Sequence, residues 1–410
     1  MFKQTTRDLR RINRSKALRE IYFNGPISRL EIYQHTDMSQ GTATNVVADL
    51  LREKIVLESG SKDSEGGRPS TLLTVNPSYG HIVGVDVGET AIRASLFDLG
   101  FQELDTVSQP LSLEENQPEQ VVQHIVSGVE QLLIGSETRA DRILGVGIGF
   151  PGLVDPAEGV SIFAPNWGWH DVPIGSILED KLRLPMALDN GAKAMALAES
   201  MFGGGRDVGS LAVLLVGTGV GAGIIEAGSL YRGAMNSAGE WGHTVLEIGG
   251  RSCRCGKKGC LEAYVGPAGI IERYTELART SPPDCSGDQK EMLRSIIQAS
   301  REGDASARKV LDDTLNYLSA GIGNLINLVN PQKVVLGGWA GMMLAEEFLP
   351  RLDEAVAQYA LQQPFKRTEI GICQLKEDAV AEGAAALILE KFLQSAGIPL
   401  ASHPAAFSTY

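Results

Sequence analysis

The first 80 residues alternate short amphipathic segments with polar breaks. Apolar residues at helical spacing predict a helix over about residues 6–23, which the Asn-Gly-Pro sequence at 24–26 ends. A short helix is expected over about 28–36 and a third over about 39–54, with a tight turn between them. A short helix, a turn and a helix with polar side chains at its N-terminal end are typical of a helix-turn-helix.

Two segments rich in apolar and β-branched residues, 55–58 and 70–75, follow the third helix and predict paired strands. The polar loop at 59–69 between them is expected in a winged variant of the motif. The start of the third helix would reach base edges in the major groove, and the loop would enter a minor groove. The predicted DNA-binding residues are Ser39, Gln40, Thr42, Thr44, Asn45, Arg68, Arg11 and Arg14. The alternative is a small interaction module without nucleic-acid binding.

The rest of the chain alternates strands and helices. A strand, a glycine turn and a strand occur at 81–98 and again at 211–225, which predicts a mixed α/β fold duplicated in two lobes. An apolar helix is expected at 318–329 and a closing helix at 378–393. The predicted domains are a DNA-binding domain at 1–76, a second domain at 80–395, and a tail at 396–410. Within the second domain, lobe 1 spans about 80–200 plus 378–393, and lobe 2 spans about 201–377.

Charge is distributed unevenly along the chain, whose net charge is −13. Residues 1–80 hold 12 Lys/Arg against 9 Asp/Glu, whereas the remainder holds 25 against 41. An acidic body disfavours nucleic-acid binding through its general surface, but a basic end fits it. No apolar run reaches the roughly 20 residues that a bilayer requires, and the start lacks a secretory signal. We therefore expect a cytoplasmic protein without a membrane partner.

A cysteine cluster is the strongest chemical signal. Cys253, Cys255 and Cys260 fall within eight residues, and His243 lies ten residues upstream. Three thiolates and an imidazole complete the tetrahedral shell of a structural Zn²⁺ site. The alternative is a disulfide and a spare thiol, which a chain without an export signal disfavours. Glu240 and Glu262 flank the cluster, so a metal-bound loop would hold two carboxylates that can accept hydroxyl protons from a polyol. Solvated surface glutamates are the alternative.

These residues also carry a family resemblance. Glu-x-Gly-His at 240–243, followed by Cys-x-Cys-Gly-x-x-Gly-Cys-x-Glu at 253–262, resembles the signature of the ROK family of repressors and sugar kinases. The resemblance covers about 80–395 and implies a two-lobed actin-like (ribonuclease H-like) sugar kinase fold, with a monosaccharide in the cleft. Residues 1–76 resemble the winged helix-turn-helix of ROK repressors. The implied sugar-binding residues are Asn190, Glu240, His243, Glu262 and Asn166. Trp167 and Trp169 either stack on the sugar or pack in the core.

The resemblance also shows what has changed relative to a kinase. The first phosphate turn of the kinases, Asp-x-Gly-Gly-Thr-Lys, reads Asp-Val-Gly-Glu-Thr-Ala at 86–91, so Glu89 lies where phosphate would bind. We predict a vestigial nucleotide site of Asp86, Gly88, Thr90, Gly217, Thr218, Gly219, Gly337 and Gly338. The catalytic pattern Asn-Asp-x-Asn reads Asn-Gly-Ala-Lys at 190–193, so Gly191 replaces the general base. We therefore expect no kinase activity.

Together these features predict a sugar-responsive transcriptional regulator. We expect a repressor of carbohydrate-utilisation genes that a monosaccharide releases, with xylose as the first candidate. Two or four copies would bind a palindromic operator in double-stranded DNA. Two alternatives remain at this stage: a sugar kinase with a DNA-binding head, and a repressor controlled by a protein partner.

Overall fold

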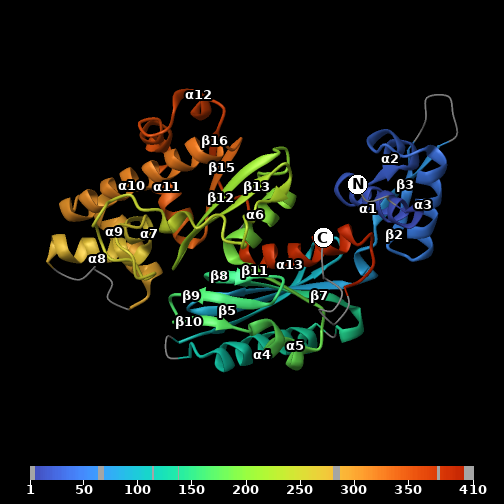
Figure 1. Ribbon diagram of the computed structural model, residues 1–410, viewed down its shortest axis with the longest axis horizontal. Coiled ribbons are helices and arrows are strands. Elements are labelled where there is room, and N and C mark those ends of the chain that lie inside the picture. The colour runs from blue at the N-terminus through green and yellow to red at the C-terminus, as the bar shows by residue number, and fades with distance from the viewer. Residues whose placement is uncertain are drawn as a thin grey trace.

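The protein has an N-terminal head and a two-lobed body (Figure 1). The computed structural model describes residues 5–62, 69–112, 115–136, 138–279, 287–375 and 379–400. No helix in these ranges combines the length and the apolar content that crossing a bilayer requires.

The head contains the helices and the hairpin that the sequence predicts. Its elements are α1 (Thr6–Asn24), α2 (Arg29–His35), α3 (Gln40–Arg52), β2 (Val56–Lys62) and β3 (Ser70–Val75). Ser28 and Ser39 cap α2 and α3 by accepting backbone N–H bonds, which fixes where both helices begin. A strand that was not predicted, β1 (Ile27–Ser28), pairs with β3. Strand β2 extends to Lys62, so the loop is shorter than expected, and Arg68 lies outside the described residues.

Lobe 1 is built on a five-stranded sheet in the order β11-β7-β4-β5-β6. The strands are β4 (His81–Val87), β5 (Ala91–Asp98), β6 (Glu103–Pro110), β7 (Ile143–Phe150) and β11 (Met186–Asn190). Helices α4 (Pro118–Gly135) and α5 (Ile174–Leu182) cover one face, and α13 (Ala379–Gln394) covers the other (Figure 1). A Cβ on Gly147 would lie 1.7 Å from the Ala384 carbonyl oxygen, so this strand requires glycine where α13 approaches. A small sheet of β8 (Leu153–Asp155), β9 (Val160–Ala164) and β10 (Trp169–Val172) completes the lobe.

Lobe 2 repeats the plan with a sheet in the order β14-β13-β12-β15-β16. The strands are β12 (Ser210–Val216), β13 (Val220–Glu226), β14 (Ser229–Leu230), β15 (Lys333–Gly337) and β16 (Glu369–Ile372). Its helices are α7 (Glu262–Val265), α8 (Pro267–Ala278), α9 (Gln289–Glu302), α10 (Ala305–Val329), α11 (Trp339–Val356) and α12 (Gln362–Phe365). The helix predicted at 318–329 is therefore only the second half of α10.

Helix α6 (Gly191–Phe202) lies at the junction of the lobes. It packs on β12 and β13 of lobe 2 and on α13, although the predicted boundary near residue 200 placed it in lobe 1. Alanine and glycine residues recur along α6 and α13, and Gly383 of α13 lies so close to Ala194 of α6 that a Cβ on it would be 2.2 Å from the Ala194 carbonyl. Helix α13 also contacts α1 of the head, so α6 and α13 connect all three units.

The head is fastened to the body by polar and aromatic contacts. Arg19 pairs with Glu390 of α13 at 2.7 Å, and the Ser15 hydroxyl donates to the Leu393 carbonyl at 2.7 Å. Phe101 and Phe202 stack with centroids 4.1 Å apart beneath the last turn of α1. This seam ties the orientation of the head to the C-terminal helix of the body.

Two predictions about this seam are wrong. Arg14 does not face DNA, because its guanidinium binds Glu53 and donates to the Ala396 carbonyl at 2.7 Å. The segment predicted as a tail begins as an ordered part of the seam, since Ala396 is buried and Gly397 lies against Leu18 and Ile55. Residues 401–410 lie outside the described residues.

Candidate functional site

Four potential metal ligands converge in lobe 2. The 3₁₀ turn Trp241–His243 and two isolated bridges, one of which pairs Val245 with Cys260, fold the loop so that all four ligand atoms lie within 4.8 Å of one another. His243 Nδ1 is 3.7 Å from Cys253 Sγ, and Cys255 Sγ is 3.7 Å from Cys260 Sγ. All three thiols are free in this structure, and the 3.7 Å between Cys255 Sγ and Cys260 Sγ exceeds the disulfide bond length of about 2.05 Å. In a tetrahedron with Zn–S bonds of about 2.3 Å the sulfurs are about 3.8 Å apart, so the donors fit Zn²⁺.

The two flanking carboxylates are held by this loop. Glu262 begins α7 next to Cys260, is 8% exposed, and accepts the Val220 N–H at 2.9 Å. Glu240 directly precedes the 3₁₀ turn that ends at His243. Burial raises the pKa of the Glu240 carboxyl group, and the positive charge of Lys193 opposes that increase. Neither residue is an exposed surface glutamate. Hydroxyl donors would supply the hydrogen bonds that a partly buried carboxylate requires.

Asn190 lies at the end of β11 in lobe 1. As the N-cap of α6, its Oδ1 accepts the Ala192 and Lys193 N–H groups, and its Nδ2 donates to the Gly152 carbonyl at 2.8 Å. One Nδ2 hydrogen remains for a ligand. Gly191, which stands where the kinase pattern has its aspartate, has little room for a side chain, because a Cβ there would lie 3.3 Å from Val380 Cγ1.

Sequence reasoning missed Lys193 and the role of Asp189. Lys193 is 1% exposed, and burial lowers the pKa of its ammonium group while Asp189 and Glu240 oppose that shift. Asp189 is fully buried and pairs with Arg232 of lobe 2, so it cannot replace a base at 191. The sequence did contain a signal for Lys193, because a lysine stands there in place of the second asparagine of the kinase pattern.

Asn166 and its neighbouring tryptophans have different roles. The Asn166 amide donates to the Glu89 carboxylate, and its Oδ1 is buried without a partner among the described residues. Trp167 and Trp169 pack in the core of lobe 1 with ring centroids 4.7 Å apart. The Trp169 indole N–H donates to the Asn116 carbonyl at 2.7 Å. The tryptophans are therefore core residues, and the alternative of stacking on a sugar is wrong.

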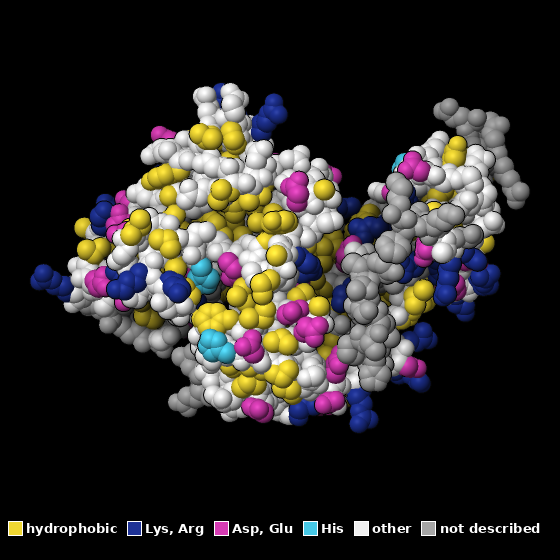
Figure 2. Space-filling model, in the orientation of Figure 1, with side chains coloured by type: hydrophobic (Ala, Val, Ile, Leu, Met, Phe, Trp, Pro, Cys, Tyr) yellow, Lys and Arg dark blue, Asp and Glu magenta, His cyan; other side chains and the backbone are white. Residues whose placement is uncertain are grey.

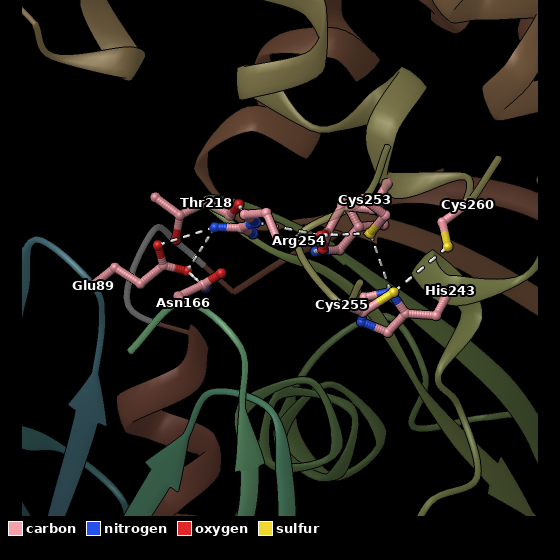
Figure 3. Close-up of polar contacts among 10 residues, drawn as sticks. Glu89, Asn166, Thr218, His243, Cys253, Arg254, Cys255 and Cys260 are labelled. Atoms are coloured by element: carbon pink, nitrogen blue, oxygen red, sulfur yellow. Dashed lines mark hydrogen bonds and ion pairs between the residues drawn. The ribbon is translucent and has the colours of Figure 1, made fainter. Parts of the chain in front are cut away.

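The predicted phosphate turns face each other across the lobes, and protein side chains fill the space between them (Figure 3). Asp86 lies in β4, and Gly88 and Thr90 follow that strand. Gly217, Thr218 and Gly219 follow β12, whereas Gly337 ends β15 and Gly338 follows it. Arg254 Nη1 donates to Glu89 Oε2 at 3.2 Å, and Nη2 donates to the Thr218 carbonyl at 2.6 Å. Burial raises the pKa of Glu89, and Arg254 opposes that shift.

The exposed side chains in the first two turns of α3 are polar and uncharged. Of the predicted DNA-binding residues, Ser39, Gln40, Thr44 and Asn45 are exposed, Thr42 is half-buried, and Arg11 is exposed on α1. The Ser39 hydroxyl also accepts the Thr42 N–H, so these two residues shape the start of the helix. Lys and Arg side chains gather at the outer edge of the head (Figure 2).

Glu31 makes the stability of the head depend on pH. It accepts hydrogen bonds from Lys62 of β2 and from Ser28, and these bonds lower the pKa of Glu31 from 4.5 to about 2. Because the folded-state pKa is depressed, this stabilisation is present above the unfolded pKa and is lost as the pH falls toward 2. We expect Glu31→Gln to cost about 1 kcal/mol at pH 7. The free energy of unfolding in urea should differ between the wild type and Glu31→Gln by a constant amount above pH 5, and this difference should shrink toward pH 3. A constant difference down to pH 3 would contradict the assignment.

Comparisons with known proteins agree with the observed fold. A profile described as ROK family matches residues 82–391. The xylose repressor of Caldicellulosiruptor bescii is 33% identical over 389 residues, covering 94% of this chain and 97% of that protein. A ROK family transcriptional regulator, described as a homolog of the E. coli MLC protein, superposes with a TM-score of 0.80 at 24% identity, covering 95% of this chain and 98% of its own. The ROK hexokinase from Thermus thermophilus superposes with a TM-score of 0.62 at 30% identity, covering 75% and 97%. The predicted two-lobed sugar-kinase-like fold is confirmed.

Proposed function

Because this chain belongs to the ROK family, we propose that it is a sugar-responsive repressor of carbohydrate-utilisation genes. The observation that carries the proposal is a set of sugar-site residues without a catalytic base, on the same chain as a helix-turn-helix head. The similarity to a xylose repressor over 94% of the chain supports it. We assign DNA contacts to the exposed side chains of α3 and to Arg11.

The effector is a monosaccharide in the cleft, with D-xylose as the first candidate. Its hydroxyl groups would donate to Glu240 and Glu262 and contact Asn190, Asn166 and the free nitrogen of His243. Zn²⁺ would be held by His243 and the three clustered cysteines. When bound, it stabilises the loop that carries both carboxylates and takes no part in catalysis.

The junction helices provide the connection from sugar to DNA. Helix α6 is capped by Asn190, carries Lys193 in its first turn, and packs along α13. Helix α13 in turn holds α1 through Glu390 and Leu393. A shift of the lobes on sugar binding would therefore move the head. In a homodimer or tetramer, such a shift changes the spacing of two heads on a palindromic operator. Sugar and operator would oppose each other by about 1–3 kcal/mol, and the coupling is reciprocal.

The proposed repressor is not an enzyme. Gly191 provides no general base, which removes about 10²–10⁴-fold of rate, and Glu89 lies between the phosphate turns. We expect no sugar-dependent ADP release in a coupled assay with MgATP and D-xylose, D-glucose or N-acetylglucosamine. Turnover with any of these sugars would favour a kinase with a DNA-binding head.

The proposal is tested with the zinc-loaded full chain. A high-affinity DNA site is selected from a random pool, and binding is followed by fluorescence anisotropy while D-xylose, D-glucose or N-acetylglucosamine is added. We expect a palindromic site and its release by one sugar. A chain that selects no site would overturn the proposal. Tight operator binding that no sugar changes would instead favour control by a protein partner.

A further inference from the structure

We propose that Glu89 and Arg254 form an inter-lobe bridge that holds the cleft closed and positions sugar-binding residues in both lobes. Glu89 lies in the β4–β5 turn of lobe 1, and Arg254 lies in the cysteine loop of lobe 2. The guanidinium donates from Nη1 to both Glu89 oxygens, at 3.2 and 3.4 Å, and from Nη2 to Thr218. The bridge therefore spans the lobes at the predicted phosphate turns.

Each end of the bridge contacts a residue that we propose binds the sugar. On the lobe 1 side, the Asn166 amide donates to Glu89. On the lobe 2 side, Arg254 Nε is 3.4 Å from Glu262 Oε1. Asn166, Glu89, Arg254 and Glu262 thus form one chain of polar contacts between the lobes. Figure 3 shows its Asn166, Glu89 and Arg254 members. Glu89 and Arg254 are positioning residues in this arrangement, because they act on the sugar through the two side chains that they orient.

Burial and charge favour the closed arrangement. The Glu89 side chain is 10% exposed and that of Arg254 is 34% exposed, so the pair is shielded more than a surface ion pair. Arg254 lies between Glu89 and Glu262, and its removal would leave two carboxylates without the cation between them. Opening the lobes would likewise separate Glu89 from its cation. Charge-assisted hydrogen bonds of this kind are stronger than neutral ones.

The bridge also explains how closure can occur without nucleotide. In a kinase of this fold, bound phosphates lie between the glycine turns of the two lobes. Here a carboxylate of the chain lies between the same turns, and a guanidinium of the chain neutralises it. The paired side chains of Glu89 and Arg254 therefore lie where phosphate would bind, and the ion pair connects the lobes in place of phosphate. Lobe closure in this protein therefore depends on sugar and on the bridge.

The bridge is tested by hydrogen exchange in the zinc-loaded full chain without sugar. We expect Glu89→Gln to speed exchange at amides 217–220 in the opposite lobe about fivefold, and Arg254→Gln to do the same at 87–91. The double variant should show no more than the larger single effect, and Arg254→Lys should restore part of the protection. Glu347→Gln is the matched control, because it removes the Arg301 ion pair elsewhere in lobe 2. Effects confined to the substituted lobe, or additive effects, would overturn the bridge.

A second measurement rests on the proposed function. The dissociation constant for D-xylose should rise about tenfold in Glu89→Gln and stay unchanged in Glu347→Gln. If the wild type binds D-xylose and Glu89→Gln binds it equally well, the positioning role is wrong. If the wild type binds no sugar, the proposed function fails, and the exchange experiment still decides whether the bridge exists. Zinc content is measured in each variant, because Arg254 lies between two of the cysteines. If Arg254→Gln loses zinc, the result for Glu89→Gln decides the test.

Discussion

A Cys260→Ser variant is expected to lose its zinc and its sugar response together. Cys260 is fully buried and lies two residues before Glu262, the first residue of α7. A hydroxyl is a poor replacement for a thiolate ligand, so the loop would no longer be tied to His243. Two carboxylates would then lose their fixed positions. Since a hydrogen bond to a charged group contributes about 1.5–3 kcal/mol, sugar affinity should fall by more than about 100-fold.

Metal analysis and calorimetric sugar titration check this prediction. The matched control is Cys373→Ser, because Cys373 is also a buried thiol of lobe 2 but bonds to Glu199 at 3.2 Å, away from the cluster. We expect one zinc per chain in the wild type and in the control. Full zinc occupancy in Cys260→Ser, or undiminished sugar affinity after zinc loss, would contradict the proposed role of the metal.

The second large effect is expected at Glu240. Glu240→Gln keeps the size of the side chain but removes the negative charge that attracts hydroxyl protons. Because the carboxyl group is largely buried, bulk water cannot replace its contacts with the sugar. We expect sugar affinity to fall by about 10–100-fold with zinc content unchanged. Release of the operator should require a correspondingly higher sugar concentration.

A surface carboxylate of the same lobe is the control for this substitution. Glu226 on β13 is exposed and accepts a hydrogen bond from Ser210, so Glu226→Gln should leave sugar affinity unchanged. Calorimetry with D-xylose measures both variants. Equal affinity of the wild type and Glu240→Gln would exclude Glu240 from the site. Zinc loss in Glu240→Gln would instead show that the substitution disturbs the metal loop.

Local patterns determined most of the elements and the metal donors before the structure was known. The polar caps Ser28 and Ser39 identified the starts of two head helices, because capping depends on neighbouring backbone groups. The Cys-x-Cys spacing and the upstream histidine identified a ligand set, because a short loop can bring such residues to one ion. The glycine turn at 217–219 likewise joined β12 to β13 as expected.

Side-chain direction was harder to predict, since it depends on what packs against an element. Arg14 lies on a helix whose basic residues were expected to face solvent, but its partner Ala396 is 382 residues away. Trp167 and Trp169 lie close to Asn166 in the sequence, but their rings pack in the core of lobe 1. Neither outcome is encoded in local periodicity.

The sequence by itself therefore determined the features that depend on residue types and on short spacings along the chain. These features include a helix-turn-helix pattern, a cysteine-histidine loop, two nearby carboxylates, and Gly191 where the kinase pattern has its aspartate. The inter-lobe bridge was decided only by tertiary structure, because Glu89 and Arg254 are 165 residues apart and lie on different lobes. A carboxylate in a turn acquires its role from the charge that folding places opposite it, and charge pairing acts through distance in space.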